Sequence, residues 1–171
     1  MARRHIALLG LTGVGKTSVG TELASILDRP LLDSDRIIEE RFGASGREIA
    51  ATQSVSRLHV VEHEVTVEML QRETPCVLGV PASAVDPEAV RSLIATHSRA
   101  VWLTAPAEVL TARMRAQSHR RSIDSVELDR LHDRRQGHFR ELAEMVADTS
   151  TADPVETARS IVSDLGLTDG R

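Results

Sequence analysis

Aromatic side chains are almost absent from this 171-residue chain, which has no tyrosine, two phenylalanines and one tryptophan. Stacking platforms for the bases of single-stranded nucleic acid are therefore not expected. The formal charge of −4 at neutral pH also gives no basic surface for nucleic acid. The core of such a chain must be aliphatic, and its length suits one domain over residues 1–171.

Cysteine and long apolar runs are equally scarce. Cys76 is the single cysteine, which excludes an internal disulfide and suits a reducing cytosol. No apolar run approaches the length that crosses a bilayer. The first residues lead into a short strand pattern and lack the apolar stretch and cleavage site of a secretory signal. We therefore expect a soluble cytoplasmic protein with no membrane partner.

Lysine is also nearly absent. Lys16 is the single lysine, and apart from the histidines every other basic residue is arginine. It lies in residues 10–17, GLTGVGKT, with the spacing of a phosphate-binding P-loop, G-x-x-x-x-G-K-[ST]. A slim ammonium reaches the β- and γ-phosphates as a point charge, whereas a wide guanidinium fits poorly. The Thr17 hydroxyl suits Mg²⁺. The motif predicts Mg²⁺-ATP as cofactor.

Short apolar runs alternate with amphipathic stretches along the chain. The alternation predicts strands at 5–9, 30–32, 76–80, 100–103 and 145–148. Helices are predicted at 17–27, 35–42, 55–72, 87–96, 107–116, 128–144 and 154–165, and Asp86 and Asp153, each before a proline, are start signals. This pattern indicates a three-layer α/β/α P-loop NTPase domain with a five-stranded parallel sheet. The polar stretch at about 117–127 is expected to form a mobile lid.

Two carboxylates, Asp33 and Asp35, follow the predicted second strand. Ligands bind at the carboxyl ends of strands in open α/β sheets. Asp33 could therefore approach Mg²⁺ beside Thr17, and Asp35 could take the proton of an acceptor hydroxyl. The alternative is that Ser34 or Asp35 simply caps a helix beginning at Arg36, and the two roles are compatible.

The P-loop, the segments 33–39 (DSDRIIE) and 43–49 (GASGREI), and the chain length together resemble the shikimate kinase family. The resemblance implies a nucleoside-monophosphate-kinase-like fold, with Asp35 contacting the acceptor hydroxyls, Arg121 of the lid reaching the transferred phosphate, and Arg135 binding the substrate carboxylate. Nucleotide contacts are implied for Gly13, Val14, Gly15, Lys16, Thr17, Ser18, Arg113 and Pro154. The alternative for the arginines is a solvated helix face with Glu141 and Asp129 as partners.

The acceptor motifs depart from the family pattern. His59, three residues before Glu62, stands where the family's F-R-x-x-E motif has its arginine. The family's Gly-Gly-Gly after the third strand is replaced around Pro81 and Ala82, and Pro81 has no N–H to offer a substrate. Losing a charged hydrogen-bond partner costs ~1.5–3 kcal/mol, roughly ten- to a hundredfold in affinity. We expect His59 and Ala82 still to line the acceptor site, which has nevertheless changed.

These features predict an ATP-dependent phosphotransferase that acts on a hydroxyl of shikimate or a similar small polyhydroxylated acceptor. Two alternatives stay open. One is a kinase of the same type for a cyclitol, a sugar acid or a nucleoside, and the other is a non-catalytic nucleotide-binding regulatory protein. A monomer or weak homodimer is expected.

Overall fold

A five-stranded parallel sheet, in the order β2-β3-β1-β4-β5, carries the fold in the computed structural model, which describes residues 4–116 and 125–167. The strands are β1 (His5–Leu9), β2 (Leu31–Asp33), β3 (Val77–Gly79), β4 (Ser98–Thr104) and β5 (Ala143–Asp148). Their register pairs Leu8 of β1 with Gly79 on one side and with Val101 on the other. The predicted α/β class and five-stranded parallel sheet are confirmed.

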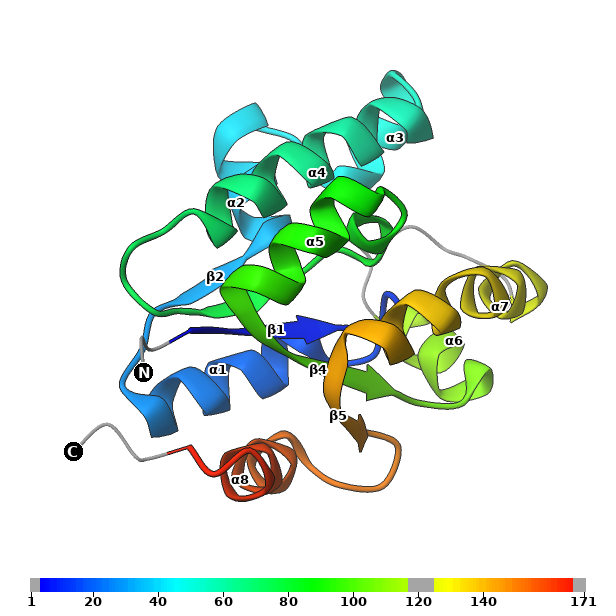
Figure 1. Cartoon of the computed structure of the whole chain (residues 1–171). Coiled ribbons are helices and arrows are strands. Elements are labelled where there is room, and N and C mark those ends of the chain that lie inside the picture. Colours follow the sequence, from blue (N-terminus) through cyan, green and yellow to red (C-terminus); the bar gives the residue numbers. More distant parts are fainter. Residues whose placement is uncertain (1–3, 117–124, 168–171) are drawn as a thin grey trace.

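Helices cover both faces of the sheet (Figure 1). They are α1 (Lys16–Leu27), α2 (Ser34–Phe42), α3 (Gly46–Thr52), α4 (Val55–Leu70), the 3₁₀ helix η1 (Ala82–Val85), α5 (Glu88–His97), α6 (Ala107–Arg115), α7 (Ser125–Leu142) and α8 (Pro154–Asp164). Helices α1 and α8 lie on one face, and α4 and α5 lie on the other. No helix in the described part of the chain is both long and apolar enough to cross a membrane.

The central strand β1 is buried along its whole length, which is what coverage of both sheet faces requires. The chain runs from β1 to the edge strand β2, returns to β3, and then crosses β1 to reach β4. The order of connections therefore changes direction beside β1. Loops from the carboxyl ends of β1, β2 and β3 meet at this point, which is where open α/β sheets bind ligands.

Three local predictions need correction. Asp33, rather than Ser34 or Asp35, caps α2, because its Oδ1 accepts the Asp35 N–H at 3.0 Å. Helix α2 therefore begins at Ser34, two residues before the alternative start at Arg36. Asp86 does not cap α5, whose N-cap is Pro87. Helix α3 was missed, although Ser45 and Glu48 form a complete capping box at its start. By contrast, Asp153 caps α8 as predicted.

Phe139 anchors α7, the helix that carries Arg135, to the sheet. Its side chain is 0% exposed and stacks on Trp102 of β4 with ring centroids 5.8 Å apart. Replacement of Phe139 by alanine should lower the free energy of unfolding by about 3–5 kcal/mol, because it leaves a cavity under the helix. Urea denaturation measures the loss.

The matched control is Arg140→Ala, which changes an exposed side chain on the same helix and should shift the free energy of unfolding by about 0.5 kcal/mol or less. Equal stability of the two variants would mean that the aromatic contact does not hold α7 in place.

Candidate active site

The loop between β1 and α1 is shaped by glycines in backbone conformations that other residues rarely adopt. Gly10 has φ 137°, and a Cβ there would lie 2.4 Å from the carbonyl oxygen of Leu103. Gly15, with φ 100°, is the N-cap of α1 and has no side chain to cap the helix. The backbone N–H groups of the first turn of α1 are therefore directed at the space where an anion would bind.

Lys16 bends back over this loop. Its Nζ donates to the carbonyl oxygens of Gly10 at 2.8 Å and Leu11 at 3.2 Å. The ammonium group therefore lies at the mouth of the loop and adds its charge to the positive end of the α1 dipole. This is the arrangement that phosphate binding requires.

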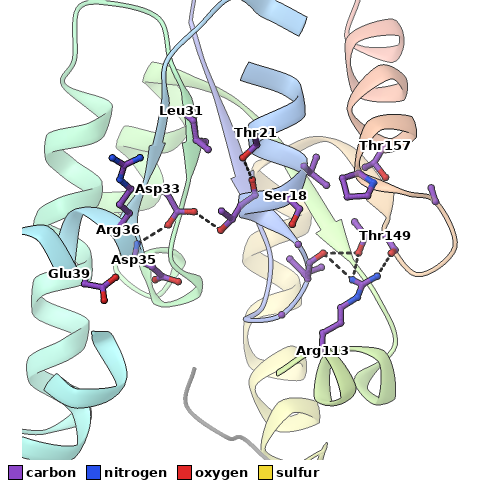
Figure 2. A pocket seen from close by; sticks show the side chains of 17 residues that line it. Ser18, Thr21, Leu31, Asp33, Asp35, Arg36, Glu39, Arg113, Thr149 and Thr157 are labelled. Carbon is purple, nitrogen blue, oxygen red and sulfur yellow. Dashed lines mark hydrogen bonds between the residues drawn. The ribbon is translucent and has the colours of Figure 1, made fainter. Parts of the chain in front are cut away.

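A cavity of about 600 Å³ opens beside the loop (Figure 2). Its lining includes the predicted nucleotide contacts Gly13, Val14, Gly15, Thr17, Ser18, Arg113 and Pro154. Asp33 and Asp35 lie on one side of the cavity, while Arg113 and Thr149 lie on the other. The volume falls in the range of small-molecule sites.

Arg113 of α6 joins two walls of this cavity. Its guanidinium donates to the backbone carbonyl of Thr149 at 2.5 Å and to the Thr149 hydroxyl at 3.1 Å. That hydroxyl in turn donates to the carbonyl of Val14 at 2.7 Å. The loop after β5 is thereby fixed to the P-loop. Thr149 is 4% exposed and connects the other members of this network.

Thr17 and Asp33 meet at the opposite wall. The Thr17 hydroxyl donates to Asp33 Oδ2 at 2.6 Å, while Asp33 Oδ1 accepts the Asp35 N–H. A Cβ on Gly79 would approach Asp33 Oδ2 to 3.3 Å, so β3 passes close behind the carboxylate. A hydroxyl and a carboxylate are hard oxygen donors, and they fit a Mg²⁺ ion that keeps other ligands from phosphate and water. Across residues 4–116 and 125–167, no three His, Cys, Asp or Glu side chains gather closely enough to hold a metal ion alone.

A second, smaller pocket of about 40 Å³ adjoins the cavity, and the two share Thr17, Asp33 and Asp35. Its lining is Thr12, Lys16, Thr17, Asp33, Ser34, Asp35, Glu62, Gly79, Pro81 and Ala82. Lys16, Asp35 and Ala82, which were assigned from distant parts of the sequence, are thus brought to one pocket. Asp35 is exposed, and its carboxylate accepts no hydrogen bond from any group in the described part of the chain.

Glu62 of α4 closes this pocket and was not among the predicted site residues. The Ser83 hydroxyl of η1 donates to Glu62 Oε2 at 2.5 Å, and the Ser83 carbonyl accepts from His63 Nε2 at 3.0 Å. Burial raises the pKa of the Glu62 carboxyl to about 7, and the charge of Asp35 acts in the same direction, although the Ser83 hydrogen bond opposes them. The Glu62 carboxyl therefore keeps its proton to a higher pH than an ordinary glutamate does.

Arg135 and His59 do not line either pocket. Arg135 is 4% exposed, and its Nε and Nη2 donate to the two carboxylate oxygens of Asp86 at 2.9 and 2.7 Å. Its partner is therefore neither Glu141 nor Asp129. His59 is half-buried, and burial, followed by the charge of Arg135, lowers the pKa of its imidazole. Arg121 and positions 117–124 of the expected lid lie outside the described residues.

Comparison with known proteins identifies relatives over most of the chain. A family model described as shikimate kinase matches residues 12–166. The shikimate kinase of Streptococcus suis is 32% identical over 163 residues, which cover 92% of this chain and 98% of that protein. The shikimate kinase of Zymomonas mobilis is 37% identical over 117 residues, or 68% of this chain and 66% of the relative. That of Cereibacter sphaeroides is 35% identical and is matched over 59% of its own length.

The solved structures agree with these sequence matches. The structure of shikimate kinase from Acinetobacter baumannii in complex with shikimate superposes with a TM-score of 0.88 and 27% sequence identity, covering 95% of this chain and 92% of that one. A gluconokinase from Sinorhizobium meliloti shares the fold at a TM-score of 0.60 and 18% identity. The structural likeness is therefore stronger to this shikimate kinase than to this gluconokinase.

The raised pKa of Glu62 makes the stability of the fold depend on pH. Because the folded chain binds this proton more tightly, the contribution to stability is complete below the ordinary pKa of 4.5 and is lost as pH rises through about 7. Between about pH 5 and about pH 8, the wild type should lose on the order of 1–3 kcal/mol of unfolding free energy relative to Glu62→Gln, which cannot ionise. Urea denaturation at both pH values measures this difference.

Glu64→Gln, an exposed position on the same helix, is the control and should follow the wild type at both pH values. A constant difference between the wild type and Glu62→Gln at the two pH values would show that Glu62 keeps an ordinary pKa.

Proposed function

The chain belongs to the shikimate kinase family, and from this premise we propose that it transfers the γ-phosphoryl group of ATP to a hydroxyl of shikimate or a similar small polyhydroxylated acceptor. The observation that carries the proposal is the small pocket, in which Lys16 and the exposed carboxylate of Asp35 both face one space beside a cavity of nucleotide size. Phosphoryl transfer needs the γ-phosphate of ATP, which Lys16 would hold, next to a proton acceptor, which Asp35 would provide.

The nucleotide half follows from the P-loop. The N–H groups at the start of α1 and the ammonium of Lys16 would hold the phosphates, while Arg113 and Pro154 would line the side away from the reaction. Thr17 and Asp33 would hold Mg²⁺, which when bound neutralises charge on the β- and γ-phosphates. We propose that the protein works in the cytoplasm, where ATP is supplied, as a monomer or weak homodimer.

In the acceptor half, Asp35 would accept the hydrogen of the acceptor hydroxyl and take its proton as the oxygen attacks the γ-phosphorus. A bond forms between that oxygen and phosphorus, the bond to the β,γ-bridging oxygen breaks, and ADP leaves. Glu62, held by Ser83, would fix an acceptor hydroxyl at the floor of the pocket. We assign Arg121, in the lid expected at 117–127, to the charge that develops on the transferred group.

Lys16 should be indispensable for transfer. Lys16→Ala is expected to lower kcat by roughly 100- to 1,000-fold, the loss seen when a donor that stabilises transition-state charge is removed. Lys16→Arg keeps the charge but should also lose most activity, because the wide guanidinium cannot lie across the Gly10 and Leu11 carbonyls as the ammonium does. Coupled ADP release with Mg²⁺-ATP and an acceptor measures both. Near-normal turnover in Lys16→Ala would refute the proposed function, and ATP binding without turnover in the wild type would indicate a regulatory nucleotide binder.

Asp35 should act on the chemical step and not on nucleotide binding. Asp35→Asn is expected to lower kcat by roughly 100-fold or more, because an amide cannot take the proton, while the dissociation constant of ATP changes little. Glu68→Gln is the control, since Glu68 is exposed on α4 and pairs with Arg41, and neither of these two residues lines the cavity or the small pocket. A kcat in Asp35→Asn that matches this control would remove Asp35 from the mechanism.

A further inference from the structure

The hydroxyl of Thr149 connects the loop after β5 to the middle of the P-loop (Figure 2). It lies 2.7 Å from the Val14 carbonyl oxygen and 3.4 Å from the Thr104 carbonyl oxygen. A hydroxyl has one hydrogen to donate, so the shorter contact, to Val14, takes it. The other donor near the Val14 carbonyl, Arg113 Nη1, is 3.4 Å away. Thr149 is therefore the main hydrogen-bond donor to this carbonyl.

Thr149 is itself held in place through its backbone. Its N–H donates to the Thr104 carbonyl at the end of β4 at 2.9 Å, and its own carbonyl accepts from Arg113 Nη2 at 2.5 Å. The residue is 4% exposed, and a β-branched side chain is restricted at χ1. The hydroxyl therefore has a fixed position, set by the carboxyl end of the sheet, from which it holds the P-loop.

The Val14 carbonyl belongs to the peptide group that also carries the Gly15 N–H. This peptide is trans, since the described residues contain no cis peptide bond, so the two groups point in opposite directions from one plane. A hydrogen bond that fixes the carbonyl therefore fixes the direction of the N–H. Gly15 cannot do this by packing, because it has no side chain and even a Cβ there would meet no atom within 4 Å.

The Gly15 N–H is available to a ligand. It donates to no protein group within residues 4–116 and 125–167. Val14, Gly15 and Thr149 all line the cavity of about 600 Å³. Because the carbonyl points at Thr149, the N–H points away from that wall. An N–H without a protein acceptor, at the positive end of α1 and next in sequence to the Lys16 ammonium, is a donor for a phosphate oxygen.

We propose that Thr149 is a positioning residue for the nucleotide, whose hydroxyl holds the Val14 carbonyl so that the Gly15 N–H is directed at a phosphate oxygen of ATP. Thr149 acts through this one peptide group of the P-loop and takes no part in the transfer step. The inference rests on the nucleotide half of the proposed function. Its main measurements use ADP without an acceptor, so they do not depend on phosphoryl transfer.

Thr149→Val removes the hydroxyl and keeps the shape of the side chain. The dissociation constant of ADP, measured by calorimetry, should rise about tenfold, since one hydrogen bond to a charged group is weakened. In the ADP-release assay the KM for ATP should rise by a similar factor, while kcat and the acceptor KM change less than about twofold. Thr149→Ser restores the hydroxyl and should bring the ADP dissociation constant to within about threefold of the wild-type value.

Thr111→Val is the matched control. Thr111 lies on α6 and is 9% exposed, and its hydroxyl donates to the Ala107 carbonyl of the same helix at 2.8 Å, outside the cavity. This variant should bind ADP as the wild type does. Equal weakening of ADP binding by Thr111→Val and Thr149→Val would overturn the inference. Wild-type affinity for ADP in a folded Thr149→Val protein would overturn it as well.

Adenosine separates an effect on phosphate binding from one that is transmitted through Arg113, which Thr149 also contacts. Because adenosine has no phosphate, its dissociation constant in Thr149→Val should stay within about twofold of the wild-type value. An equal rise for adenosine and ADP would place the effect at the Arg113 wall of the cavity and would overturn the inference.

A measurement on the wild-type protein needs no substitution. The amide proton signal of Gly15 in an isotope-labelled sample should move downfield with ADP and stay nearly constant with adenosine, because a hydrogen bond to phosphate deshields the proton. A Gly15 signal that ADP leaves unchanged would overturn the inference. Binding of ADP with a shifted Gly15 signal, but without turnover of any acceptor, would support the inference and contradict the proposed transfer. Absence of ADP binding would overturn both.

Discussion

One hydrogen bond, from the Thr17 hydroxyl to the Asp33 carboxylate, connects the two halves of the site. Thr17 belongs to the first turn of α1 and so to the phosphate-binding half, whereas Asp33 ends β2 and caps α2. Because Asp33 uses its other oxygen to hold the Asp35 N–H, the position of the catalytic candidate Asp35 depends on the same carboxylate. The placement of the Asp35 backbone relative to the first turn of α1 is therefore set by one residue with two partners.

The nucleotide half could be predicted from the sequence because its geometry is local. The P-loop spans eight consecutive residues, its conformation is imposed by glycines such as Gly10 and Gly15, and the flanking strand and helix have clear periodicities. The strand-end position of Asp33 and Asp35 is equally local. The error about which residue caps α2 moved the helix start by two positions and left the site unchanged.

The acceptor half could not be predicted in the same way, because its contacts join residues far apart in the chain. Ser83 meets Glu62 from 21 positions away, and Arg135 meets Asp86 from 49 positions away. The Asp-Pro pair at 86–87 is a good local signal for a helix cap, and the tertiary ion pair overrides it. No single-sequence pattern distinguishes a surface arginine with local partners from a buried one with a distant carboxylate.

The two halves are also held by different forces, which explains how one can change while the other is retained. Phosphate binding depends on backbone conformation, and a Cβ at Gly10 would overlap the Leu103 carbonyl, so few substitutions are tolerated. The small pocket, by contrast, is lined in part by the side chains of Asp35 and Glu62, which can be substituted without changing the backbone conformation. The P-loop is therefore constrained by its backbone, while the small pocket can change through its side chains alone.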